Sequence, residues 1–206
     1  MAESSRETAT LAVFDFDDTL IKGDSLWAFF FFVVGVVPVF AGIVEALAAF
    51  GWVRMTNPRH PDLADLRTFI KARLITTLLA GKTLDRVAPA IERLARWQTW
   101  NEAMRRELLD HAASGHHIVI ASGALDIYLP MLVKDLPHDA LICTCIGVEN
   151  GAITGQMVSG NCVRRRKAEM VGAYIAEHGP FTEGWGYGNY PHDMPMLGLV
   201  RHRVLV

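Results

Sequence analysis

Residues 11–19 read LAVFDFDDT, an apolar, β-prone run that leads directly into Asp15, Asp17, Asp18 and Thr19. The apolar residues predict a buried strand over 11–16, and the polar residues predict a turn at its carboxyl end. Open α/β sheets bind their ligands at the carboxyl ends of strands. Asp15 and Asp17 flank one bend and can converge on one point, so we expect functional carboxylates at this strand end.

The rest of the chain alternates between strand and helix patterns. Apolar runs at 117–121 (HIVIA), 140–145 (ALICTC), 184–188 and 203–206 predict further strands, and the turn-rich stretch 147–155 predicts a hairpin. Helical patterns cover 84–100, 102–113, 126–132 and 167–177. This alternation predicts an α/β fold with a mostly parallel sheet.

The connection between the first two predicted strands is unusually long. Roughly ninety residues separate them, too many for an ordinary crossover connection. An apolar stripe at three- and four-residue spacing runs through residues 63–78 and predicts a helix inside this connection. We therefore expect a core made of 1–20 and 111–206, with residues 21–110 forming an inserted helical cap.

The composition excludes several classes of protein. The 206 residues carry 20 Lys and Arg against 22 Asp and Glu, a net charge of −2, so no basic surface indicates a nucleic-acid partner. Cys143, Cys145 and Cys162 are too few for a disulfide framework and fit a reducing, cytoplasmic compartment. The polar amino terminus lacks the basic and apolar pattern of a signal peptide.

Four motifs, in order along nearly the whole chain, resemble those of haloacid dehalogenase-like (HAD) phosphohydrolases. They are DFDDT at 15–19, IVIAS at 118–122, Lys167 at the start of a helix, and GNYPHDMPML at 188–197. The lysine motif is similar to that of the phosphoserine phosphatase-like branch. The resemblance implies a Rossmann-like core (the HAD fold) with a helical cap between the first two motifs.

The resemblance also implies roles for individual residues. Asp15 would attack phosphorus and form an aspartyl phosphate, and Asp17 would protonate the leaving oxygen and then activate water. Ser122, Gly123 and Lys167 would hold the phosphate oxygens; a hydroxyl and a cation stabilise developing negative charge in any case. Dehalogenases of this superfamily lack the second aspartate, so Asp17 argues against dehalogenation.

The cofactor that the resemblance implies is Mg²⁺. The residues that it assigns to the metal are Asp15, Asp17, Asn189 and Asp193. The family motif usually begins Gly-Asp, whereas this chain has Asn189. An amide oxygen can ligate a hard cation, but one negative charge is lost. A catalytically weak HAD-fold binding or regulatory protein therefore remains an alternative to an enzyme.

Two residues are candidates for substrate recognition. Asp24 lies nine residues after Asp15, near the position where phosphoserine phosphatases carry a glutamate that reads the substrate's amino group. A helix N-cap role shared with Ser25 is the alternative. Arg73, on the predicted cap helix, would clamp a substrate anion or lie on a solvated face. Arg164 stands where this branch often has glycine.

Residues 26–44 contain no charge, and extension to residue 53 adds only Glu45. The length is that of a transmembrane span, but a single crossing would separate Asp15 from Ser122. Gly35, Pro38 and Gly42 allow two arms, 26–37 and 39–53, which would form an interfacial hairpin. The alternative is a pair of packed cap helices, although a small cap has little interior for the aromatic residues at 27 and 29–32. Basic residues flank the segment: Lys22, Arg54 and Arg59.

The apolar segment also indicates which class of substrate to expect. A HAD motif followed by a long apolar cap segment is similar to the arrangement of type C phosphatidylglycerophosphate phosphatases. The resemblance implies a phosphomonoester on a lipid head group, with the enzyme on the inner face of the cytoplasmic membrane and in contact with it through 26–53. The alternative is a soluble enzyme acting on phosphoserine or another phosphorylated small metabolite.

Overall fold

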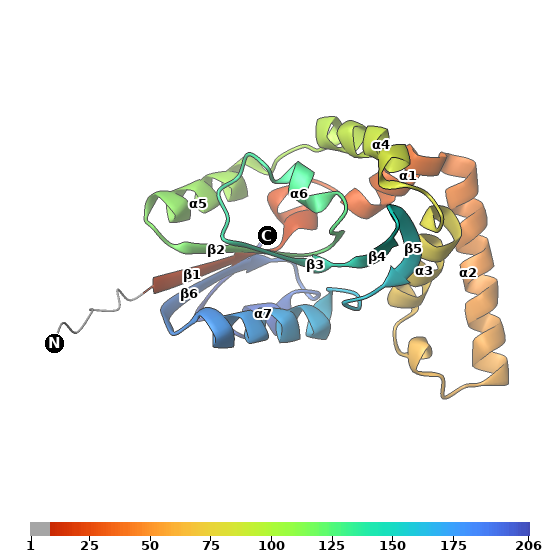
Figure 1. Ribbon diagram of the computed structural model, residues 1–206. Helices are drawn as coiled ribbons and strands as arrows, with labels where there is room; N and C mark the ends of the chain where they lie inside the picture. The colour runs from red at the N-terminus through yellow and green to blue at the C-terminus, as the bar shows by residue number, and fades with distance from the viewer. Residues whose placement is uncertain (1–8) are drawn as a thin grey trace.

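The computed structural model describes residues 9–206, and a five-stranded parallel sheet lies at its centre (Figure 1). The strand order is β3-β2-β1-β6-β7. The strands are β1 Ala9–Phe14, β2 His117–Leu125, β3 Ala140–Thr144, β6 Phe181–Gly188 and β7 His202–Leu205. Every neighbouring pair is parallel, which confirms the predicted α/β fold. Residues 1–8 of the expected core lie outside the described residues.

Strand β1 occupies the middle of the sheet because both of its faces are apolar. Ala12 and Phe14 join a core cluster with residues of α5 (Glu102–Ala113) and α6 (Leu129–Leu132). Leu11 and Val13 join a second cluster with α7 (Arg164–His178) and α8 (Met194–Leu197). A strand that is buried on both faces reads as a continuous apolar run, as this one does. Its end places Asp15 at the centre of the carboxyl edge.

The insertion forms a helical cap at that end of the sheet (Figure 1). Its helices are α1 Ser25–Val34, α2 Val36–Thr56, α3 Leu66–Leu74 and α4 Leu84–Trp97. The predicted hairpin is present as β4 Ile146–Glu149 and β5 Ala152–Met157, and it packs beside the turn Ile75–Leu79 that continues α3. Our boundary at residue 110 falls inside α5, which packs against β1 and β2.

The predicted helix at 126–132 is much shorter than expected. Only Leu129–Leu132 of the stretch 126–132 is helical. Asp126 forms hydrogen bonds with residues outside the predicted helix. Its N–H donates to the Thr144 carbonyl at 3.1 Å, and its carboxylate accepts the Ile146 N–H at 3.2 Å. These bonds to the end of β3 and the start of β4 hold Asp126 in a turn, so the helix starts later.

Helix α1 is packed inside the protein. Phe29 and Phe30 are fully buried, and the Phe29 ring lies 4.8 Å from the Tyr128 ring of the core. The other three aromatic side chains are partly buried against the same core cluster: Trp27, Phe31 and Phe32. The expectation that the cap lacks room for these rings is wrong, because α1 packs against both α4 and the core.

Helix α2 has a different environment. The chain breaks only at Gly35, where φ is +85°. Pro38 lies in the first turn of α2, where its missing N–H is not needed. Gly42 does not break the helix; a Cβ there would lie 2.8 Å from Leu74, so glycine permits close packing on α3.

The outer face of α2 is apolar and exposed. Among the described residues α2 is the one helix long and apolar enough to cross a membrane, by length and composition alone, and only 17% of its apolar stretch is buried. Figure 1 shows it as the outermost helix of the cap. Its exposed large apolar side chains are Val36, Val37, Phe40, Val44, Leu47, Trp52 and Met55.

Candidate active site

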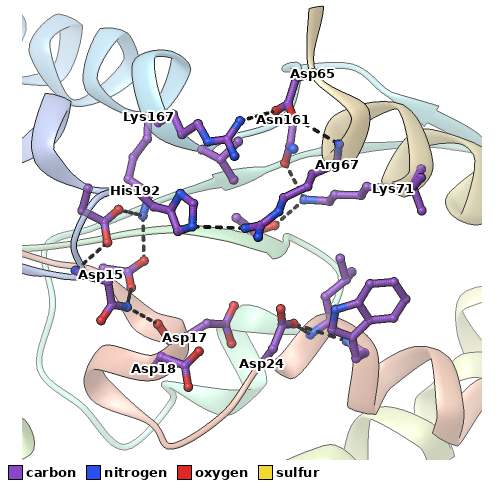
Figure 2. Close-up of a pocket in the computed structure, with 18 of the residues that line it drawn as sticks. Asp15, Asp17, Asp18, Asp24, Asp65, Arg67, Lys71, Asn161, Lys167 and His192 are labelled. Atoms are coloured by element: carbon purple, nitrogen blue, oxygen red, sulfur yellow. Dashed lines mark hydrogen bonds and ion pairs between the residues drawn. The ribbon is translucent and has the colours of Figure 1, made fainter. Parts of the chain in front are cut away.

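A cavity of about 710 Å³ lies between the carboxyl edge of the sheet and the cap (Figure 2). The core contributes mainly charged and polar side chains to it, among them Asp15, Asp17 and Lys167. The cap contributes apolar side chains from three helices: Leu26, Trp27, Ile43, Ile70 and Leu74. These apolar side chains form a wall on the cap side, opposite the charged end at the sheet. Charged residues of the cap segment interrupt this wall: Asp24, Asp65, Arg67 and Lys71.

Asp15 is held rigidly at the charged end. One carboxylate oxygen accepts a bond from Lys167 Nζ at 2.6 Å, and the other accepts one from Thr19 Oγ1 at 2.8 Å. Its backbone N–H donates to the Tyr187 carbonyl on β6 at 2.9 Å. Burial raises the pKa of Asp15, and Asp193 adds to this, while Lys167 opposes it. The ion pair with Lys167 favours the ionised, nucleophilic carboxylate.

Lys167 bridges two carboxylates. Its Nζ donates to Asp15 Oδ1 and to Asp193 Oδ1, each at 2.6 Å, and all three side chains are nearly inaccessible. Burial alone would lower the pKa of Lys167, but Asp15 and Asp193 outweigh it and raise the pKa. The ammonium group therefore stays charged, beside the place where a phosphoryl group would meet Asp15.

Asp17 lies in a different electrostatic environment. Its Oδ1 accepts the Ser25 N–H at 2.7 Å, at the start of α1. Burial, then repulsion from Asp24, raises the pKa of Asp17 to about 7. A carboxyl group with such a pKa can hold a proton and release it near neutral pH. Asp15 and Asp17 thus lie two residues apart with environments suited to different roles.

Asn189 lies where several oxygen atoms converge. Its Nδ2 is 3.1 Å from the Asp17 carbonyl oxygen, 3.1 Å from Thr19 Oγ1 and 3.5 Å from Asp15 Oδ2. A rotation of the amide would exchange its nitrogen for its oxygen. One carboxylate, one backbone carbonyl and one amide oxygen then form a donor set that fits a hard cation keeping several waters.

Two further observations define this donor set. Within residues 9–206, no group of three or more His, Cys, Asp or Glu side chains could hold a metal ion, so any cation here needs amide and backbone oxygens. Both oxygens of Asp193 already have protein partners: Lys167 Nζ, and the Asn189 N–H at 2.9 Å. Asp193 thereby orients Lys167 and Asn189.

The predicted phosphate-binding turn follows the apolar part of β2. Gly123 lines the cavity, whereas Ser122 is fully buried beneath it and its Oγ accepts the Ala124 N–H at 3.0 Å. A Cβ on residue 123 would lie 2.9 Å from a Val163 methyl group. Glycine is therefore needed for close approach between β2 and the segment that leads into α7.

Of the two residues predicted to contact the substrate, the structure places only Asp24 at the cavity. Asp24 lines the cavity, but its carboxylate also caps α1 by accepting the Leu26 and Trp27 N–H groups at 2.9 and 3.3 Å. Arg73 is not among the cavity-lining residues and pairs with Glu45 of α2. The Arg73 side chain therefore points toward α2 of the cap and away from the cavity.

The sequence analysis missed the cap residues that do face the core. Lys71 and Arg67 of α3 line the cavity, and Arg67 Nη1 donates to His192 Nε2 at 3.1 Å (Figure 2). Their four-residue spacing, beside the apolar stripe, was the available signal. Arg164 also lines the cavity and pairs with Asp65 at 3.1 Å. Its φ is +49°, a left-handed conformation that glycine adopts with the least strain.

The fold and this site define a class: α/β proteins with a buried aspartate at the end of the central strand and a lysine bonded to it. The chain belongs to the haloacid dehalogenase-like hydrolase family, whose profile matches residues 12–198.

The chain is also similar to individual proteins in sequence or in fold. The chain is 24% identical over 193 residues to phosphoserine phosphatase SerB2 of Mycobacterium tuberculosis; the match covers 93% of this chain but only 42% of that protein. A protein of unknown function from Bordetella pertussis Tohama I has the same fold, with TM-score 0.73, 21% identity, and coverage of 96% of this chain and 90% of that one. The phospho-aspartyl intermediate analogue of a phosphoserine phosphatase matches with TM-score 0.60, 17% identity and coverage of 97% and 87%.

Proposed function

We propose that the protein is a Mg²⁺-dependent phosphomonoester hydrolase that acts through an aspartyl phosphate on Asp15. The observation that carries the proposal is the position of Asp15, fixed by Lys167 and Thr19 at the charged end of the cavity, with Asp17 two residues further on.

The chemistry would run in two steps. A carboxylate oxygen of Asp15 attacks phosphorus and the ester P–O bond breaks, while Asp17 donates its proton to the leaving oxygen. Asp17 then takes a proton from water, whose oxygen attacks phosphorus and releases phosphate from Asp15. Lys167, the Ser122 hydroxyl and the Gly123 N–H would bind the phosphate oxygens. Asp15, the Asp17 carbonyl and Asn189 would hold Mg²⁺, which would offset the negative charge of the phosphate.

Asn189→Asp is expected to tighten Mg²⁺ binding by roughly tenfold, because it adds a negative charge to a donor set with few charges. Isothermal titration calorimetry with MgCl₂ measures this independently of turnover. Asp18→Asn is the control. Asp18 is exposed and lies next to Asp17 in the sequence, and its carboxylate accepts a hydrogen bond from the Gly23 N–H. Equal Mg²⁺ affinities in wild type and Asn189→Asp would contradict this metal site.

For the substrate we propose a membrane lipid phosphate such as phosphatidylglycerophosphate. Its support is the apolar wall of the cavity and the exposed apolar face of α2, the helix that also contributes Ile43 to that wall. Arg54 and Arg59, both exposed at the end of α2, match anionic head groups in charge. The enzyme would then be cytoplasmic and peripheral on the inner face of the membrane.

The proposal is tested by phosphate release with and without Mg²⁺ from three substrates: an aryl phosphate, O-phosphoserine, and phosphatidylglycerophosphate in detergent. A preference for the lipid is expected. A preference for O-phosphoserine would instead support the soluble alternative, which the phosphoserine phosphatase relatives favour. If folded protein releases phosphate from none of the three substrates, the result would support the alternative of a HAD-fold binding protein without catalytic activity.

Charge on the outer face of α2 is expected to abolish membrane binding. Phe40→Glu with Val44→Glu places two carboxylates at positions that are 58% and 67% exposed, so folding should tolerate them. We expect wild type to co-sediment with vesicles of phosphatidylglycerol and phosphatidylcholine, and the double variant to stay in the supernatant. Val158→Glu, also 67% exposed but outside α2, should sediment like wild type.

Two results would contradict the membrane contact. One is wild-type protein that stays in the supernatant at low salt. The other is equal loss of sedimentation in Val158→Glu. A change from dimer to monomer in the double variant, measured by light scattering without vesicles, would assign the α2 face to a second copy of the chain instead.

A further inference from the structure

Lys71 connects the cap to the turn that is expected to bind phosphate. It lies on α3, is only 7% exposed, and its Nζ donates to three oxygen atoms of the core. These are the Gly123 carbonyl at 2.5 Å, Asn161 Oδ1 at 2.7 Å and Thr144 Oγ1 at 3.0 Å. None of the three acceptors carries a charge.

The three acceptors belong to segments that build the phosphate site. Gly123 follows Ser122 in β2, and Asn161 precedes α7, the helix that carries Lys167. Thr144 joins them, because its Oγ1 donates to the Gly123 carbonyl at 3.1 Å and accepts the Cys162 N–H at 3.0 Å. Lys71 thus holds the β2 turn and the start of α7 against each other.

This contact exists only while the cap lies on the core. Neighbouring residues of α3 reinforce it: Asn161 Nδ2 donates to Thr68 Oγ1 at 2.8 Å, and Asp65 pairs with Arg164. The cavity-facing side of α3 is therefore bonded to the same two core segments. A cap that swings away would release the Gly123 carbonyl and Asn161 together.

Burial of the Lys71 ammonium group has an electrostatic cost. Burial lowers the pKa of Lys71 to about 8, although the facing carboxylates of Asp17 and Asp24 and the thiols of Cys143 and Cys162 oppose this. A lysine pKa that is lower in the folded state than in the unfolded state means that burying the charged form reduces the free energy of unfolding at neutral pH. An apolar side chain of similar length would avoid this cost.

We propose that Lys71 is a positioning residue that couples closure of the cap to assembly of the phosphate-binding turn. The inference rests on the proposed function, since it assigns phosphate to that turn. Lys71 acts through the Gly123 peptide and the segment before Lys167, and it is not assigned a contact with the substrate.

Lys71→Met tests the proposal, with Arg73→Met as the matched control. Arg73 lies on the same helix, but its partner is Glu45 within the cap. Inhibition of aryl phosphate hydrolysis by inorganic phosphate, in the presence of Mg²⁺, is expected to weaken roughly tenfold in Lys71→Met, because the phosphate-binding turn loses the bonds that hold it in place. Arg73→Met should match wild type. A thermal unfolding curve for each variant establishes that it is folded at the assay temperature.

Hydrogen exchange gives a readout that does not need turnover. Amides in peptides covering 121–125 and 159–163 are expected to exchange faster in Lys71→Met and unchanged in Arg73→Met. Unchanged exchange in Lys71→Met, or the same increase in both variants, would overturn the proposal. If wild type hydrolyses no ester but the exchange difference persists, the proposed function fails and the positioning role of Lys71 stands.

Discussion

Asp15→Asn is expected to reduce phosphate release by at least about 10⁴-fold, the scale seen when a covalent nucleophile is removed. The substitution keeps the shape of the side chain but removes the charge that Lys167 binds at 2.6 Å. Asp193 remains as a partner for Lys167, so the fold should persist. The measurement is phosphate release from an aryl phosphate with Mg²⁺, together with a thermal unfolding curve.

The matched control for Asp15→Asn is Asp18→Asn. Asp18 is exposed and lines the same cavity, and its φ of +55° is a conformation that asparagine adopts readily. Asp18→Asn should retain activity within a fewfold of wild type. Activity of Asp15→Asn close to that of wild type would rule out an aspartyl phosphate on Asp15. Acid-quench mass spectrometry should find the phosphorylated peptide in wild type and in Asp18→Asn, but not in Asp15→Asn.

Lys167→Met is expected to destabilise the protein by about 3–5 kcal/mol, because it leaves Asp15 and Asp193 as buried carboxylates without their cation. For a chain of this size the melting temperature should fall by roughly 6–20 °C. Catalysis should fall as well, since the cation beside the phosphoryl position is gone. Thermal unfolding followed by circular dichroism measures the first effect.

The pH dependence separates this cause from simple loss of packing. A buried carboxylate that loses its cation binds a proton more tightly in the folded state than in the unfolded state. Stability of Lys167→Met should therefore increase, relative to wild type, as the pH falls from 8 to 5. A gap in melting temperature that stays constant over this range would contradict the ion-pair explanation. Arg166→Met, whose partners on the same helix are exposed, is the control and should change little.

Much of the core could be predicted because its signals are local. The strand at 11–16 and its acidic turn were predicted from nine consecutive residues, and the helix at 102–113 was predicted with the bounds that the structure has. Apolar alternation and turn chemistry act over a few residues. The place of Asp15 and Asp17 at one cavity follows from the carboxyl end of a strand in a parallel sheet, whereas Lys167 on α7 was predicted only through the family resemblance.

The cap could be predicted only in outline. Arg73 and Lys71 lie two residues apart on one helix, and both are cations beside an apolar stripe. Their different partners, Glu45 within the cap and Gly123 in the core, depend on how α3 is rotated over the sheet. That rotation is set by packing against α2, including the close approach at Gly42, and no pattern within α3 specifies it.

The amino-acid sequence by itself determined the α/β class, the inserted cap and the carboxylates at the first strand end, because each depends on side chains that are neighbours along the chain. The tertiary structure alone decided which apolar helix is buried. Helices α1 and α2 have similar compositions, yet α1 meets α4 and Tyr128 while the outer face of α2 meets no other element among the described residues. Burial depends on what packs against a face, and partners distant in sequence become neighbours only when the chain folds.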